Sequence, residues 1–299
     1  MKKILLFLIF TVLFMGISVQ IAEASFISDK IYRYEQSRIY KKEYKQIKKF
    51  FEVHNSFANK HDINSLKPLY SDNYLNNDGF NKEIYFKNVE ETWEECPDIT
   101  YKTKIISLNL NGDYASVNVE ETAIGTVFET IETYAVAGEI HSKSTGIYHL
   151  KKINDKWLIL GETVLTDESS LVYGDARFMN IDLESPSQVA SGADYTTSVK
   201  VDADPNTFII ASIEHDPIKY PSQIPNGPLR AMPQSMILER ILKANTDNLN
   251  EYTIASLAIS KTKDLGFGDY KIYMTGLACI MKRVNVIPKN NFAKIEEKE

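Results

Sequence analysis

The sequence predicts an α+β protein in which three helices precede a run of long antiparallel strands, with a set of shorter strands after them. Between residues 43 and 96 the apolar residues recur at three- and four-residue spacing, which is the period of a helix with one packed face. After Pro97 the period changes to two, the alternation of a half-buried strand. Because helices come first and strands follow, the pattern favours the α+β class over an alternating α/β fold.

Three helices are expected in order. The apolar face of the first one consists of Tyr44, Ile47, Phe50, Phe51, His54, Phe57 and Ala58. Asp62 is suited to be the N-cap of a second, short helix, because a carboxylate can accept a hydrogen bond from the first free backbone N–H groups. Asn81 is the expected N-cap of the third helix, which Pro97 ends.

Four long strands are expected after Pro97, at residues 99–110, 114–130, 134–153 and 157–166. Asn111-Gly112-Asp113 and Asn154-Asp155 are typical of hairpin turns between them. Beyond a short hinge at Gly174-Asp175-Ala176, shorter strands alternate with turn signals, which indicates a β-sandwich. Residues 236–244 fit either a strand or a helix.

The first 24 residues have the order of a secretory signal peptide. Lys2 and Lys3 precede an apolar stretch over residues 4–19, and Ala22-Glu23-Ala24 supplies the small-x-small cleavage motif. Cleavage after Ala24 would export the chain, and the alternative is an uncleaved membrane anchor. We expect an exposed lead-in over residues 25–42, a charged tail over residues 291–299, and no stable membrane span after cleavage.

Composition excludes several classes of function. With a net charge of −6, the chain lacks the broad positive field with which proteins bind nucleic acid. HExxH, GxSxG, P-loop and GxGxxG motifs are absent from the sequence, so we expect neither a metal site nor a cofactor. Cys96 and Cys279 are the two cysteines, and we expect two unpaired thiols, although export would permit a disulfide.

Two stretches resemble a known family. Residues 59–70, NKHDINSLKPLY, resemble the corner between the first two helices of the NTF2-like superfamily, the SnoaL-like and ketosteroid-isomerase-like cone fold. Residues 148–159, YHLKKINDKWLI, resemble its penultimate hairpin. The resemblance spans about residues 43–167 and implies three helices on a curved antiparallel sheet, with a pocket between them. We expect this domain over residues 43–173 and an Ig-like β-sandwich, without the Cys–Trp–Cys set, over residues 178–290.

The resemblance also implies a pair of candidate catalytic residues. An ungapped count from Tyr70 places Asp78 where ketosteroid-isomerase-like members carry a carboxylate base. Counting back from Asp62 places His54 where those enzymes carry the tyrosine that donates to the oxyanion. Glu120, Glu139 and His141 are nearby candidates for a second donor. Asp78 directly before Gly79 also fits a turn, and His54 also fits a core histidine.

The sequence favours an exported, non-catalytic binding protein over an enzyme. The cone would bind a small apolar ligand or form a homodimer, and the β-sandwich would contact another macromolecule. The candidate ligand-binding residues are Trp93, Tyr101, Glu120, His141 and Tyr148. One alternative is an isomerase or dehydratase, in which Asp78 and His54 converge within about 4–6 Å on one cavity. The other is a structural envelope module, without a cavity of roughly 300 Å³ or more under the first helix.

Overall fold

The structure is a computed structural model that describes residues 37–131, 134–204, 207–222, 227–266 and 269–289. It divides into two units, residues 1–50 and residues 51–299. The described part of the first unit, residues 37–50, is helical. The second unit opens with helical residues 51–58 and contains the described strands. The predicted signal peptide (1–24), the first part of the lead-in (25–36) and the charged tail (291–299) lie outside the described residues.

The helical elements of the second unit begin at the predicted caps. Residues 51–58 are followed by α2 (Ile63–Leu66), the 3-10 turn η1 (Lys67–Leu69) and α3 (Lys82–Glu95). Asp62 Oδ1 accepts a hydrogen bond from the Ser65 N–H at 3.1 Å. Asn81 Oδ1 accepts one from the Ile84 N–H at 3.0 Å. Both N-cap predictions are therefore confirmed.

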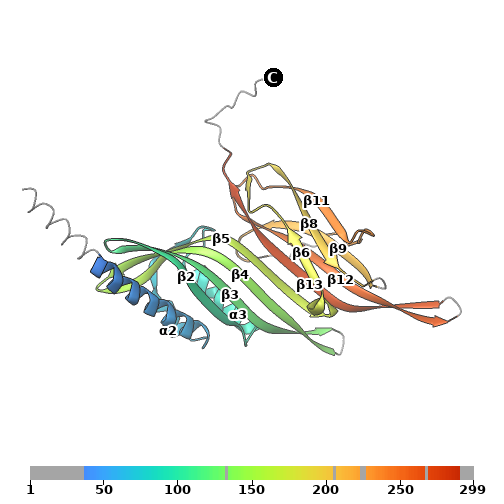
Figure 1. Cartoon of the computed structure of the whole chain (residues 1–299), viewed down its shortest axis with the longest axis horizontal. Coiled ribbons are helices and arrows are strands. Elements are labelled where there is room, and N and C mark those ends of the chain that lie inside the picture. Colours follow the sequence, from blue (N-terminus) through green and yellow to red (C-terminus); the bar gives the residue numbers. More distant parts are fainter. Residues whose placement is uncertain (1–36, 132–133, 205–206, 223–226, 267–268, 290–299) are drawn as a thin grey trace, which may run out of the picture. The chain divides into compact units, whose positions relative to one another are not determined.

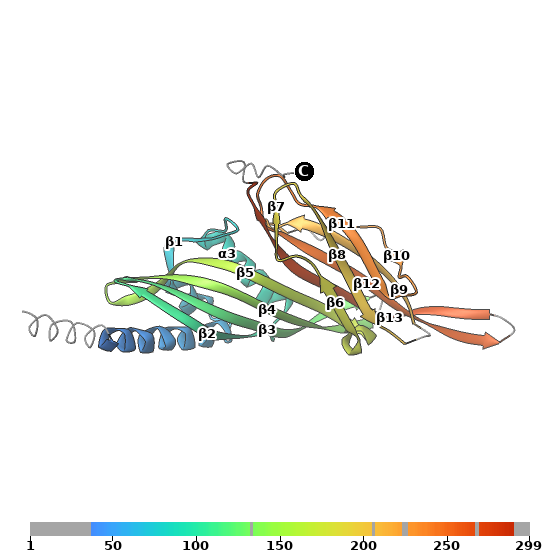
Figure 2. The same ribbon diagram turned by 45° about the horizontal axis from the view of Figure 1, so that its top comes forward.

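The strands that follow form a long antiparallel sheet. Its first members are β2 (Thr100–Asn111), β3 (Tyr114–Ile131), β4 (Tyr134–Ile153) and β5 (Lys156–Gly174), and the helices cover one face of it (Figures 1 and 2). Register shifts in the β2–β3 and β4–β5 pairs mark irregularities of the kind that bend strands. Two features were not predicted: β5 continues to Gly174, and β1 (Tyr70–Asn76) pairs with it in parallel.

The remaining strands form two β layers around one apolar core. They are β6 (Asn180–Glu184), β7 (Gln188–Ala190), β8 (Asp194–Asp202), β9 (Thr207–Pro217), β10 (Arg230–Ala231), β11 (Ile237–Lys243), β12 (Glu251–Gly266) and β13 (Asp269–Ile287). β11, β8 and β6 make a three-stranded sheet. Leu183 and Val199 from that sheet are fully buried in one cluster with Ile213, Leu257 and Ile280 from β9, β12 and β13. Residues 236–244, which fitted either type of element, contain strand β11.

The large sheet is continuous from β2 to the C-terminal strands. Its order is β10-β9-β12-β13-β5-β4-β3-β2, because Gly276–Lys282 of β13 pairs with Glu168–Gly174 of β5. Beyond Lys261, β12 has no β9 partner, so the ends of β12 and β13 project as a two-stranded arm (Figures 1 and 2). The expected hinge at Gly174-Asp175-Ala176 is instead the end of a paired strand followed by a 3-10 turn, η2 (Asp175–Phe178).

Gly174 is required where β5 meets β13. Its φ of +57° and ψ of −131° are rarely adopted by other residues, and an added Cβ would overlap the backbone carbonyl oxygen of Thr275. We expect Gly174→Ala to lower the free energy of unfolding by about 3 kcal/mol or more, measured by urea denaturation. Gly112→Ala is the matched control, because Gly112 has a φ of +58° but open space around it, and should cost only about 1–2 kcal/mol. Equal losses would contradict the close approach.

Both cysteines are free thiols, which confirms the prediction: Cys96 is buried and Cys279 is half-buried. Among the described residues, the helices are too short or too polar to cross a bilayer.

Candidate functional site

A cavity of about 190 Å³ lies between residues 54–58, α3 and strands β2 to β4. It is smaller than the roughly 300 Å³ of a typical ligand site. At ~30 Å³ per water it holds the equivalent of about six waters, so side chains do not fill it. Its apolar lining residues are Ala58, Leu66, Val89 and Ala123.

Aromatic side chains make up much of the cavity wall. Three of the predicted ligand-binding residues line it, Trp93, Tyr101 and Tyr148, and Tyr85 joins them. The Trp93 Nε1–H donates to the Tyr101 hydroxyl at 3.2 Å. The ring of His61 stacks on Trp93 with centroids 4.7 Å apart and an interplanar angle of 11°, so the indole is held in place from outside the cavity lining.

Glu121 is the acidic group of the cavity. It lies opposite Thr103 of β2 and Ser144 of β4, and all three residues line the cavity. The Tyr148 hydroxyl donates to Glu121 Oε2 at 3.1 Å, and the Thr103 hydroxyl lies 2.7 Å from Oε1. Burial raises the pKa of the Glu121 carboxyl, and these two hydroxyl groups only partly offset that effect. Among the described residues that line the cavity, none is Lys or Arg.

His54 supplies an unpartnered polar atom. Its side chain is buried and lines the cavity, and Nε2 lies 2.8 Å from the Tyr70 hydroxyl, which in turn lies 3.1 Å from the Tyr85 hydroxyl. The other ring nitrogen, Nδ1, is buried and has no hydrogen-bond partner. Burial lowers the pKa of His54 to about 4, so the imidazole is neutral at pH 7.

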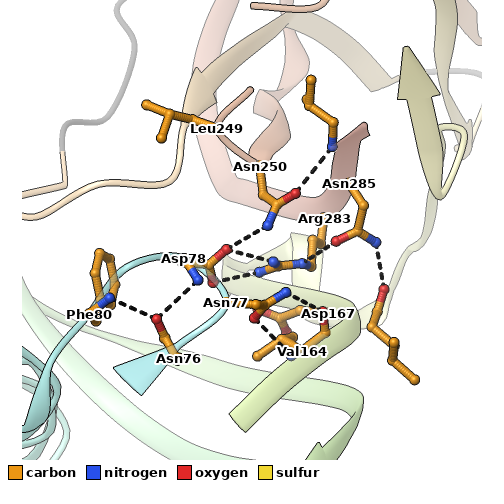
Figure 3. Close-up of polar contacts among 12 residues, drawn as sticks. Asn76, Asn77, Asp78, Phe80, Val164, Asp167, Leu249, Asn250, Arg283 and Asn285 are labelled. Carbon is orange, nitrogen blue, oxygen red and sulfur yellow. Dashed lines mark hydrogen bonds and ion pairs between the residues drawn. The ribbon is translucent and has the colours of Figure 1, made fainter. Parts of the chain in front are cut away.

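Asp78 does not join His54, which corrects the expected acid–base pair. Asp78 is absent from the lining of the cavity, and its side chain is only 5% exposed. Arg283 binds it in a bidentate manner, with Nη1 2.9 Å from Oδ2 and Nη2 2.6 Å from Oδ1, and Asn250 Nδ2 donates to Oδ1 at 2.8 Å (Figure 3). Charge-assisted bonds of this kind fix the carboxylate against β13 and leave it unsuited to act as a base in the cavity.

The turn around Asp78 closes a gap in the edge of β5. β1 pairs with β5 as far as Glu162, and β13 pairs with it from Glu168 onward. Between them, Asn77 Oδ1 accepts from the Val164 N–H at 3.0 Å, and its Nδ2 donates to the Val164 carbonyl at 3.2 Å (Figure 3). Asn285 Nδ2 donates to the Leu165 carbonyl at 2.8 Å. Side-chain amides thus replace the missing strand partner.

Glu120 and His141, the other two predicted ligand-binding residues, also lie outside the cavity. Glu120 forms an ion pair of 3.4 Å with Lys143. His141 Nε2 lies 3.7 Å from Glu139 Oε2, and His141 lines a separate groove of about 670 Å³ together with Lys143. The physical reason is the period of a strand: residues at odd and even positions of β3 and β4 face opposite sides of the sheet.

Sequence reasoning therefore missed Glu121 by a single residue. The register that would have found it runs through Tyr148, which lies opposite Val117 of β3. Val117 and Glu121 are four residues apart and share a face, so a pocket position for Tyr148 places Glu121 in the pocket. A local signal was also present, because Ala115, Val117 and Val119 form the buried face of β3 and Glu121 continues that alternation.

Within the described residues, no group of three or more His, Cys, Asp or Glu side chains could hold a metal ion.

Comparison with known proteins gives likenesses of fold only. No family model matches the chain, and no curated protein matches its sequence. Among solved structures, an NTF2-like protein of unknown function from Shewanella oneidensis is 15% identical, covers 40% of this chain and 96% of its own, and has a TM-score of 0.27. The hexachlorocyclohexane dehydrochlorinase LinA type 2 is 11% identical over 41% of this chain and 83% of its own, with a TM-score of 0.33. The Kfla4162 protein from Kribbella flavida is 8% identical over 42% and 90%, with a TM-score of 0.35.

Proposed function

We propose that this chain is an exported, non-catalytic binding protein that holds a small ligand in the cavity beside His54 and Glu121. The observation that carries the proposal is the composition of the cavity wall, in which Trp93, Tyr101 and Tyr148 lie beside the polar side chains of His54 and Glu121. Aromatic walls with a few polar groups are typical of ligand sites.

The isomerase or dehydratase alternative fits the described geometry less well, because it needs the Asp78 carboxylate in the cavity, whereas Arg283 and Asn250 hold it elsewhere. The structural module predicts no cavity of roughly 300 Å³ or more, and the cavity of about 190 Å³ meets that condition. What favours binding over the structural module is the lining, which combines aromatic walls with a few polar side chains.

The C-terminal half is proposed to be an Ig-like β-sandwich that contacts another macromolecule. Two layers around one core support the sandwich. The projecting arm supports the contact, because Ile272, Tyr273 and Met274 there are 60%, 42% and 51% exposed. Export rests on the predicted signal peptide, and a homodimer is a further proposal for the cone.

Native mass spectrometry of the protein purified from its host tests the binding proposal. We expect a small molecule that stays bound under native conditions and is lost on denaturation, and the same spectrum gives the number of subunits. Val89 lines the cavity from α3, so Val89→Phe should fill the cavity and abolish retention. The control is Ile106→Phe on β2, where the side chain is 57% exposed and lies outside the cavity lining. The proposal would be rejected if the wild-type protein retained no ligand and if added ligand mixtures raised its melting temperature no more than that of Val89→Phe.

A further inference from the structure

We infer that the ligand is a small organic cation, an ammonium compound of about the size of choline, which pairs with Glu121 inside the aromatic wall of the cavity. The inference rests on the proposed function, because it names the class of ligand for the same cavity.

The first argument is charge. The polar partners of the Glu121 carboxyl in the cavity are the hydroxyl groups of Tyr148 and Thr103, and the described lining includes no Lys or Arg. A carboxylate removed from water is stabilised most by a cation within hydrogen-bond distance, which this protein does not supply there. An anionic ligand would instead meet Glu121 without a positive partner.

The second argument is the aromatic lining of the cavity. Trp93, Tyr101, Tyr85 and Tyr148 come from α3, β2 and β4 and line the same small space as Glu121. Aromatic faces attract cations through their quadrupole, tryptophan most strongly, and the attraction is stronger when the pair is removed from water. Trp93 is held by the His61 ring on one side and by its bond to the Tyr101 hydroxyl, so the indole is preorganised.

The third argument is size and polarity. Space equivalent to about six waters suits a compact ammonium group with a short tail. Ser144, another lining residue, carries a hydroxyl group that can pair with a hydroxyl or N–H group of that tail. Because the His54 imidazole in the lining is neutral, it does not repel the cation.

Binding should tighten as the pH rises. The Thr103 hydroxyl has one proton but lies 2.9 Å from Asn55 Oδ1 as well as 2.7 Å from Glu121 Oε1. A protonated Glu121 that donates to Thr103 leaves the Thr103 proton for Asn55 Oδ1 and so satisfies both contacts. A cation requires the ionised carboxylate, and burial raises the pKa of Glu121, so binding releases a proton. The titratable groups around Glu121 are His54, Tyr85, Tyr148 and Glu162.

The test is isothermal titration calorimetry of the purified protein with choline and with 3,3-dimethylbutan-1-ol, its uncharged isostere. We expect choline to bind at least about tenfold more tightly than the alcohol, since charge pairing and cation–π contact both act on choline alone. Glu121→Gln should lower the affinity for choline by about tenfold or more and leave the affinity for the alcohol unchanged. Glu120→Gln is the matched control, because it removes the same charge from the neighbouring residue outside the cavity.

Equal binding of choline and the alcohol, or equal losses in Glu121→Gln and Glu120→Gln, would overturn the inference. The comparison of the two probes on the wild-type protein decides it even where Glu121→Gln does not fold. If neither probe binds but native mass spectrometry finds a retained ligand, the inference fails and the proposed function stands. If neither probe binds and no ligand is retained, both fail.

Discussion

Replacing Arg283 by Met is expected to lower the free energy of unfolding by about 3–5 kcal/mol at pH 7. The Arg283 side chain is 1% exposed, and its guanidinium makes two hydrogen bonds to Asp78 and one, through Nε at 2.8 Å, to Asn285 Oδ1. Without Arg283 the Asp78 carboxylate stays buried beside a single neutral donor, Asn250. An uncompensated buried charge is the costly product of breaking such a pair. Urea denaturation measures the loss, provided that the dependence of the unfolding free energy on urea concentration is the same in both proteins.

Two further variants test whether the cost comes from the Asp78 carboxylate that is left buried without a cationic partner. Asp78→Asn combined with Arg283→Met removes both charges, so it should recover much of the loss, which a double-mutant cycle quantifies. Asp72→Asn breaks a 2.8 Å pair between Lys82 and an Asp72 side chain that is 99% exposed, and should change stability by less than about 1 kcal/mol. If Arg283→Met costs no more than Asp72→Asn, this network does not stabilise the junction of β5 with β13.

The helices and long strands could be predicted because their signals are local. Asp62 and Asn81 cap the elements that they were expected to cap, and β4 covers residues 134–153 as predicted. β1 was missed because residues 70–76 pair with β5, some 90 residues later in the chain, and only that pairing makes them a strand. The extension of β5 to Gly174 depends on β13 in the same way.

The site was predicted only in part: the sequence identified its aromatic residues but assigned its acidic residue to the wrong position. Trp93, Tyr101 and Tyr148 are large aromatic residues at positions that the helix and strand periods turn inward, and the structure places all three in the cavity. The acid was misplaced in two ways. Asp78 was assigned by counting along a resemblance, whereas its partner Arg283 lies 205 residues away and leaves no local trace. Glu120 was named instead of Glu121 although Val117 and Val119, the buried residues of β3, share their face with Glu121.

Glu162 is a second partly buried carboxyl on the same sheet face as Glu121, next to Tyr148 in the β4–β5 register. Tyr74 donates to its Oε2 at 3.2 Å. Burial raises the pKa of Glu162 to about 8, and the negative charge of Glu121 adds to the effect. An unfolded glutamic acid has a pKa of about 4.3. The native state therefore binds a proton over a pH range in which the unfolded chain has lost it.

Such a shift makes stability depend on pH with a definite sign. The contribution of protonated Glu162 is complete below pH 4.3 and is lost as the pH rises toward 8, at about 1.4 kcal/mol for each unit of difference between the two pKa values. His54 acts in the opposite sense, since its pKa is lowered to about 4 and the unfolded chain gains a proton below about pH 6.5. Between about pH 4.3 and 6.5 the two effects nearly cancel, and above about pH 6.5 only the Glu162 effect remains, so the stability of the wild-type protein should fall from there toward pH 8.

Glu162→Gln isolates the first of these effects. Glutamine keeps the shape of the protonated acid and cannot ionise, so the variant should be more stable than the wild type by only about 1 kcal/mol at pH 5 and by several kcal/mol at pH 8.5. Urea denaturation of both proteins between pH 5 and 8.5 gives the difference, from which the His54 contribution cancels. Glu168→Gln is the control, because that side chain is 53% exposed on the same strand. A difference that stays flat with pH would show that Glu162 is ionised at little cost in the native protein, and that the sheet face beneath the cavity tolerates two negative charges.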